Sequence, residues 1–192
     1  MPGSGHKIIF EGPELAGKSY LMSQIYNYLE PKYNSGGQLL DGCHWFNLDV
    51  GIYGSSYGQI LLNKFTELME QLKESHVLLE KFHLSEATYQ QIYHDKIFDC
   101  VPWEERLKEL GAKIILVTFR EDEALIKKRL ADRLKLYPHY ARIAKEPGDY
   151  ISQQRIMLEI AKKSQLPIHI VDASILPNDA LLGNILEFLG EK

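Results

Sequence analysis

The sequence contains little cysteine and has no excess of positive charge. Its two cysteines, Cys43 and Cys100, are far apart and have no histidines at zinc-binding spacing, so they predict neither a disulfide framework nor a zinc site. The 22 basic and 26 acidic residues leave a net charge of -4, with the two signs interspersed. The sequence contains no basic stripe that could attract a phosphate backbone, so its charge does not indicate nucleic acid as a partner. A local basic site is still possible in this charge pattern.

Long apolar segments are also missing. No run reaches the roughly 20 residues that cross a bilayer, and residues 1–6 lack the apolar core of a signal peptide. We therefore expect a cytoplasmic protein without a membrane partner. With 192 residues, of which 45% are hydrophobic, the chain is predicted to bury one core and to form a single domain over residues 1–192.

The sequence does contain an alternation of short apolar runs and segments with helical periodicity. The runs predicted to form strands are 7–11, 43–49, 76–80, 113–119 and 167–172. Apolar residues recur at helical spacing in 18–29, 57–74, 103–110, 121–135, 150–163 and 178–189. The runs lack strict apolar-polar alternation, as strands covered on both faces do. This pattern predicts an α/β fold, a three-layer α/β/α sandwich around a five-stranded parallel sheet, with ligands at the carboxyl ends of the strands.

One segment matches a phosphate-binding motif, G-x-x-x-x-G-K-S/T. It consists of Gly12, Pro13, Glu14, Leu15, Ala16, Gly17, Lys18 and Ser19. It follows an expected strand directly and opens an expected helix, which is the context in which the motif cradles phosphate. The two glycines let backbone N–H groups crowd around phosphate oxygens, and the helix adds its positive amino end.

The motif predicts ATP and Mg²⁺ as cofactors. Lys18 is expected to reach the β and γ phosphates, and the Ser19 hydroxyl is expected to bind Mg²⁺. Glu80 ends the run 76–80 at the same edge of the sheet. Its carboxylate is a candidate for organising the magnesium or for accepting a hydroxyl proton, and the alternative is a solvated residue at a strand end.

These residues resemble the thymidylate kinase-like and deoxynucleoside kinase-like group of P-loop nucleotide kinases, and the likeness extends through most of the chain. Residues 10–19 resemble the phosphate loop of that group, with Glu14 where the family places an acid near the sugar hydroxyl of the acceptor. Residues 125–133 look like the start of the family's helical lid, expected at approximately 120–148. Arg129 and Arg133 are four residues apart, so they share one helix face and could stabilise charge on the γ-phosphate; a solvated cationic face is the alternative.

The resemblance also implies an acceptor site. Residues 80–85 are similar to the family's Asp-Arg-Tyr-x-x-Ser segment, which makes Lys81 and Ser85 candidate substrate-binding residues. Tyr89 and Gln90 resemble a Tyr-Gln pair that lies near the acceptor base in the family.

Two departures from the family concern this acceptor site. Lys81 stands where the family has arginine, and a lysine loses the planar two-point grip on phosphate. The family's Arg-Glu-Pro-Gly segment is replaced by residues 47–54. Within them, Asp49 is a candidate catalytic and substrate-binding residue, a general base for a hydroxyl as in the deoxynucleoside kinases. The alternative is a turn residue before Gly51.

The leading hypothesis is an ATP-dependent phosphotransferase that moves the γ-phosphate to a small, nucleotide-like acceptor, with a deoxynucleoside monophosphate as the leading candidate. A first alternative is a kinase acting on a hydroxyl of a nucleoside, a modified nucleobase in nucleic acid or another small metabolite. A second is a regulator that binds nucleotide without catalysis. The sequence leaves a homodimer open.

Overall fold

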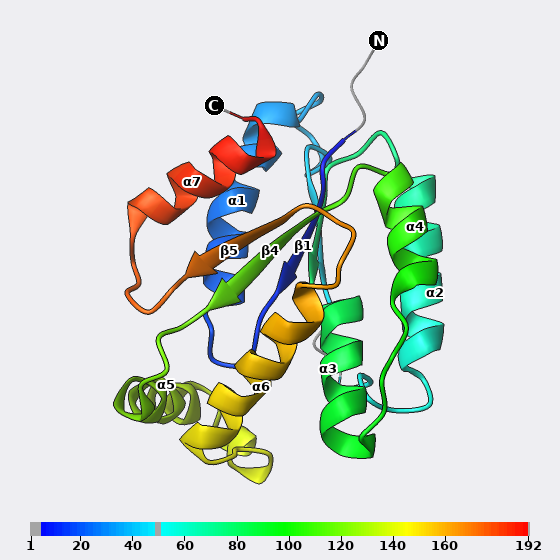
Figure 1. Ribbon diagram of the computed structural model, residues 1–192. Coiled ribbons are helices and arrows are strands. Elements are labelled where there is room, and N and C mark those ends of the chain that lie inside the picture. The colour runs from blue at the N-terminus through cyan, green and yellow to red at the C-terminus, as the bar shows by residue number, and fades with distance from the viewer. Residues whose placement is uncertain (1–4, 49–50, 192) are drawn as a thin grey trace.

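The computed structural model describes residues 5–48 and 51–191, which fold into one five-stranded sheet with helices on both sides (Figure 1). The strands are β1 (Lys7–Glu11), β2 (His44–Asn47), β3 (Val77–Glu80), β4 (Lys113–Thr118) and β5 (Ile168–Asp172). The helices are α1 (Lys18–Tyr33), α2 (Gly58–Gln71), α3 (His83–His94), α4 (Val101–Glu109), α5 (Glu123–Leu136), the 3-10 helix η1 (Pro138–Arg142), α6 (Pro147–Ala161) and α7 (Asp179–Leu189).

The strands are all parallel and lie in the order β2-β3-β1-β4-β5. In Figure 1, α1 and α7 cover one face of the sheet, while α2, α3 and α4 cover the other. Successive side chains of a strand point to opposite faces, and in β1 both faces are covered: Ile8 and Phe10 pack in the core on the α1 side, and Ile9 packs in the core on the α2 side. The predicted three-layer sandwich with a five-stranded parallel sheet is confirmed.

All five expected strands and all six expected helices are present, with ends shifted by a few residues. Helix α3 and the 3-10 helix η1 were not expected. The first eight residues of α3 are all buried although several of them are polar, so the sequence does not separate a polar outer face from an apolar inner face and shows no helical period. The carboxylate of Glu11 determines where α3 begins, because it accepts hydrogen bonds from the backbone N–H groups of Phe82 and Leu84, both at 2.9 Å, and of Ser85 at 3.2 Å.

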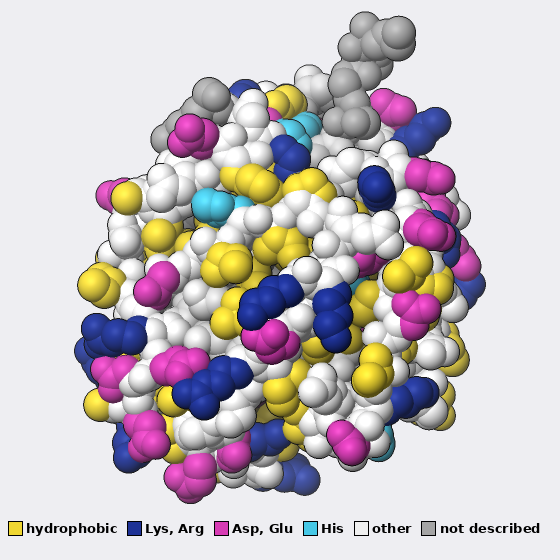
Figure 2. Space-filling model, in the orientation of Figure 1, with side chains coloured by type: hydrophobic (Ala, Val, Ile, Leu, Met, Phe, Trp, Pro, Cys, Tyr) yellow, Lys and Arg dark blue, Asp and Glu magenta, His cyan; other side chains and the backbone are white. Residues whose placement is uncertain are grey.

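Basic and acidic side chains are interspersed on the surface shown in Figure 2, as they are along the sequence. Hydrophobic side chains occupy the centre of the face shown in Figure 2, over the edge strand β5, where Ile170 is 55% exposed. Basic and acidic side chains are intermixed around them. Among the helices of the described residues, none is long and apolar enough to cross a membrane.

A buried carboxylate stabilises the amino-terminal end of the sheet. The side chain of Glu191 is 3% exposed. Its carboxylate accepts hydrogen bonds from Lys32 and, at 2.7 Å, from Tyr33, and it lies 2.6 Å from the Nε2 atom of His6. Burial alone would raise the pKa of Glu191, but these hydrogen bonds outweigh it and lower the pKa from 4.5 to about 2. Glu191 therefore stabilises the folded state in its charged form.

We expect Glu191→Gln to destabilise the protein by about 1–3 kcal/mol at pH 7, as the loss of hydrogen bonds to a charged group does. Because the folded-state pKa is depressed, this contribution is complete above pH 4.5 and is lost as the pH falls toward 2. Urea unfolding of wild type and variant at several pH values measures it. Glu159→Gln, which removes an exposed carboxylate, is the control. A constant difference between wild type and Glu191→Gln down to pH 2 would contradict the assignment.

Candidate active site

A cavity of about 990 Å³ lies at the carboxyl ends of β1, β2 and β3. Four parts of the chain line it: the loop between β1 and α1 with the start of α1, the ends of β2 and β3, one side of α5 with η1, and the segment after β5. The edge of the sheet at which parallel strands end was the expected place for a ligand.

The loop between β1 and α1 has the shape of a phosphate cradle. Gly12, Leu15 and Gly17 have positive φ angles of 148°, 64° and 94°. Left-handed residues in such a loop turn successive N–H groups toward one concavity, which favours an anion. The glycines are also required by space, since a Cβ atom on Gly12 would lie 2.3 Å from the carbonyl oxygen of Val117. The loop geometry therefore fits a nucleotide phosphate.

Lys18 follows this loop at the start of α1 and is 5% exposed. Its Nζ atom donates hydrogen bonds to the carbonyl oxygens of Gly12 at 3.0 Å and Pro13 at 2.8 Å. The ammonium group is thus folded against the loop that the phosphates would occupy. An ammonium group in that position can bridge the loop and a phosphate oxygen.

Ser19 and Glu80 form the second part of the cavity. The Ser19 hydroxyl donates a hydrogen bond of 2.8 Å to Oε1 of Glu80. Glu80 is 4% exposed, and its Oε2 atom is buried without a hydrogen-bond partner among the described residues. A buried carboxylate oxygen in this state is explained by a bound ion, a bound water or a catalytic role.

This pair fits Mg²⁺. The described residues contain no group of three or more His, Cys, Asp or Glu residues that could hold a metal ion. Magnesium in phosphate-transferring sites needs no such group, since one or two protein oxygens, the substrate phosphates and water complete its shell. Ser19 and Glu80 would supply those protein oxygens.

Glu14 connects the loop to two tyrosines. Its Oε1 atom accepts a hydrogen bond of 3.1 Å from Tyr89 of α3, and its Oε2 atom accepts one from Tyr140 of η1. Burial raises the pKa of both tyrosines, which keeps their hydroxyls protonated and able to donate. The Nζ atom of Lys81, a further residue of the cavity wall, lies 5.8 Å from the centre of the Tyr89 ring. The structure thus brings together Glu14, Lys81 and Tyr89, three of the residues expected to bind the acceptor.

The other candidate acceptor residues lie elsewhere. Ser85 is 1% exposed and its hydroxyl donates to Glu11, and Gln90 donates a hydrogen bond of 2.7 Å to Glu86. Neither is among the described residues that line the cavity, and Tyr89 reaches it only through its contacts with Glu14 and Lys81. Ser85 helps to hold the start of α3 through Glu11. Gln90 helps to hold Glu86, which also accepts a hydrogen bond of 2.7 Å from the N–H of Gly54. Asp49, the candidate general base, lies outside the described residues.

The two arginines of α5 differ in their surroundings. Both line the cavity. Arg129 donates hydrogen bonds to the carbonyl oxygens of Leu15 at 2.9 Å and Ser174 at 3.2 Å, and to that of Ala173. Its guanidinium therefore ties α5 to the phosphate loop and to the segment after β5.

Arg133 instead lies on two aromatic rings, 5.0 Å from the centres of both Tyr137 and Tyr140. Its Nε atom is buried and has no hydrogen-bond partner among the described residues. Contact with ring faces holds a guanidinium without neutralising it. Of the two arginines, Arg133 is the one whose position suits an incoming anion.

The residues of the cavity wall that the sequence analysis did not single out include Tyr140 and Asn47. Tyr140 belongs to a segment rich in tyrosine, histidine and basic residues, and that composition was the available signal. Asn47 ends β2 and is paired in register with Glu80, so its place follows from strand pairing, which the sequence does not reveal.

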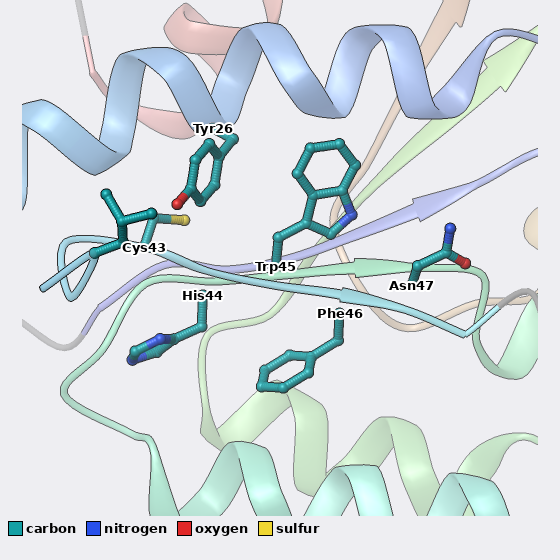
Figure 3. A pocket seen from close by; sticks show the side chains of 7 residues that line it. Tyr26, Cys43, His44, Trp45, Phe46 and Asn47 are labelled. Atoms are coloured by element: carbon teal, nitrogen blue, oxygen red, sulfur yellow. The ribbon is translucent and has the colours of Figure 1, made fainter.

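A second, shallower hollow of about 600 Å³ lies beside the edge strand β2. Figure 3 shows the side chains of Trp45 and Asn47 on the side of β2 that faces α1, next to Tyr26, and those of His44 and Phe46 on the opposite side. The ring centres of Tyr26 and Trp45 are 5.9 Å apart. Asn47 lines both this hollow and the larger cavity.

Comparison with known proteins finds no matching family model and no matching curated sequence. Solved structures do match. The YorR protein of Bacillus subtilis, in complex with phosphorylated GDP, is 22% identical, with a TM-score of 0.68 and coverage of 95% of each chain. Thymidylate kinase from Ehrlichia chaffeensis is 14% identical, with a TM-score of 0.55 and coverage of 98% of this chain and 100% of that chain.

Deoxyadenosine kinase from M. mycoides, with bound dATP, is also 14% identical, with a TM-score of 0.55 and coverage of 96% of this chain and 98% of that chain. These neighbours confirm the resemblance to P-loop nucleotide kinases at the level of the fold. The fold of the chain is that of a P-loop kinase.

Proposed function

We propose that the protein is an ATP- and Mg²⁺-dependent phosphotransferase that moves the γ-phosphate to a small, nucleotide-like acceptor, and that residues 1–192 act as one kinase domain with a lid at about 120–148. The observation that carries the proposal is the composition of one cavity. It combines a phosphate cradle, the Ser19 and Glu80 pair and the guanidinium of Arg133. A nucleotide-binding regulator that transfers no phosphate would need the cradle and the magnesium pair, but not the guanidinium.

In this proposal each residue acts on charge or position. Lys18 and the loop amides hold the β and γ phosphates, and Mg²⁺, when bound by Ser19 and Glu80, neutralises charge on the transferred group. The lid helix α5 contributes Arg133 to the cavity that Lys18 also lines, where its guanidinium would stabilise negative charge on the γ-phosphate. For an acceptor that attacks through a hydroxyl, the unpartnered oxygen of Glu80 is in addition the best candidate to take the proton.

The acceptor is proposed to bind between Glu14, Lys81 and Tyr89, with a deoxynucleoside monophosphate as the leading candidate. Glu14 can accept hydrogen bonds from a sugar hydroxyl, and Lys81 supplies a positive charge beside the Tyr89 ring. The single ammonium of Lys81 also suits an acceptor without a phosphate, since it lacks the two-point grip of arginine. A nucleoside, a modified nucleobase or another small metabolite with a hydroxyl therefore remains the second candidate, with Asp49 as a further candidate base.

Labelled ATP with a panel of acceptors tests the proposal. We expect transfer of the γ-phosphate to a deoxynucleoside monophosphate, such as thymidylate, in the presence of Mg²⁺. Transfer to nucleosides without transfer to monophosphates would establish the second candidate. Tight binding of ATP with no acceptor-stimulated turnover across the panel would contradict both and leave a regulator. Parallel reactions with EDTA distinguish enzymatic transfer that depends on the metal from background hydrolysis.

A further inference from the structure

Two tyrosine hydroxyls form a directed chain of hydrogen bonds from α6 to the phosphate loop. The backbone N–H of Lys145 donates to the Tyr150 hydroxyl at 3.1 Å, and the Tyr150 and Tyr140 oxygens are 3.3 Å apart. The one proton of Tyr140 points to Glu14, because a carboxylate only accepts. Tyr150 must therefore donate to Tyr140, and the chain ends on the Glu14 carboxylate.

Tyr140 performs a second task with its ring. The guanidinium of Arg133 lies 5.0 Å from the ring centre, and the Tyr140 side chain is 6% exposed, so the ring is fixed in its place. The Tyr140 hydroxyl donates a hydrogen bond to Glu14 of the phosphate loop, and the Tyr140 ring packs against Arg133, which lines the cavity. One side chain thus links Glu14 to Arg133.

Both oxygens of Glu14 are already occupied by tyrosine hydroxyls. Each carboxylate oxygen can accept a second hydrogen bond, but a ligand hydroxyl that takes the position of either tyrosine on Glu14 displaces that tyrosine. Tyr89 belongs to α3, which is anchored at its start by Glu11, whereas Tyr140 belongs to η1, which packs on α5. Of the two, Tyr140 is the hydroxyl that can yield without disturbing the sheet.

We propose that Tyr140 is a positioning residue of the lid with two separable parts: its ring orients Arg133 toward the γ-phosphate, and its hydroxyl latches the lid to Glu14 until an acceptor hydroxyl replaces it. The inference rests on the proposed function for its kinetic part only. The latch itself is a property of the protein without ligands. Acceptors that bring a hydroxyl to Glu14 break the hydrogen bond between Tyr140 and Glu14, and acceptors without such a hydroxyl leave it intact.

Hydrogen exchange in the absence of any ligand tests the latch. We expect Tyr140→Phe to exchange about tenfold faster than wild type in the backbone amides of residues 137–145, since it lacks the hydroxyl that ties η1 to Glu14. Tyr57→Phe, which removes a hydroxyl from a side chain that is 64% exposed, is the matched control and should exchange like wild type. Equal exchange in Tyr140→Phe and wild type would overturn the proposal, whether or not the protein is a kinase.

Kinetics separate the ring from the hydroxyl. With thymidylate as acceptor, we expect Tyr140→Phe to lower the acceptor KM about threefold to tenfold at unchanged kcat, because the Tyr140 hydroxyl then no longer competes for the Oε2 atom of Glu14. With 3′-deoxythymidylate the same variant should match wild type. We expect Tyr140→Leu and Arg133→Ala each to lower kcat about 10- to 100-fold, and the double variant to lose no more than either alone.

Similar kinetic effects of Tyr140→Phe and Tyr140→Leu would overturn the two-part assignment. If Tyr140→Leu does not fold, Arg133→Ala and Tyr140→Phe still decide it, because one must change kcat and the other KM. If wild type does not phosphorylate thymidylate, the acceptor proposal fails on its own, and hydrogen exchange alone then supports or overturns the latch.

Discussion

Replacing Lys18 with alanine should lower kcat for phosphoryl transfer by about 10³-fold or more, because a preorganised charge beside the transferred phosphate is lost. The Nζ atom of Lys18 is bonded to two carbonyl oxygens of the phosphate loop, so the variant also loses the group that draws loop and phosphate together. A coupled assay at saturating ATP and acceptor measures the change, and calorimetry with ATP and Mg²⁺ measures the accompanying loss of affinity.

Lys64→Ala is the control for this experiment. Lys64 lies on α2, with a side chain that is 69% exposed and pairs with Glu67, so its loss should change neither kcat nor ATP affinity. The thermal melting curve of Lys18→Ala should remain cooperative, which separates a defect in the site from a defect in folding. Turnover by Lys18→Ala at the wild-type rate would refute the phosphate cradle.

Replacing Glu80 with glutamine should lower kcat by about 10²- to 10³-fold, the range observed when a positioned acid-base group or charge is removed from a transition state. Glutamine keeps the shape and can still accept the hydrogen bond from Ser19, but it removes the charge from a residue that is 4% exposed. If Glu80 organises the metal, the Mg²⁺ concentration for half-maximal rate should rise as well. If it acts only as the base, that concentration should stay constant.

A magnesium titration of initial rates, at fixed ATP, separates the two roles of Glu80. Glu105→Gln removes an exposed carboxylate from α4 and should leave both kcat and the magnesium requirement unchanged. Wild-type kcat and magnesium dependence in Glu80→Gln would remove this residue from the mechanism. Asp49 would then be the remaining candidate base.

The phosphate loop could be predicted because its chemistry is local. Eight consecutive residues carry the motif, and the strand before it and the helix after it follow from hydrophobic periodicity. The parallel sheet was predictable for a similar reason, since strands buried on both faces leave unbroken apolar runs. Glu80 could be assigned to the same edge because the carboxyl ends of parallel strands lie together.

Features that depend on contacts between distant segments could not be predicted. Arg129 and Arg133 have the same helical face and sequence spacing, yet one is bonded to three carbonyl oxygens and the other lies on two rings. Ser85 has the expected spacing for an acceptor site, but Glu11, 74 residues away, holds its hydroxyl. Such partners are determined by how the helices pack, and a single sequence does not record that packing.

The carboxylate of Glu11 has a further mechanical consequence. Glu11 is the last residue of β1 and lies directly before Gly12. Its carboxylate also fixes the start of α3, the helix that carries Tyr89. The phosphate loop and the tyrosine of the proposed acceptor site are therefore both held by the same strand end. During a catalytic cycle those two surfaces should keep a constant separation, and the in-line alignment of donor and acceptor would be adjusted by the movement of α5 and η1 alone.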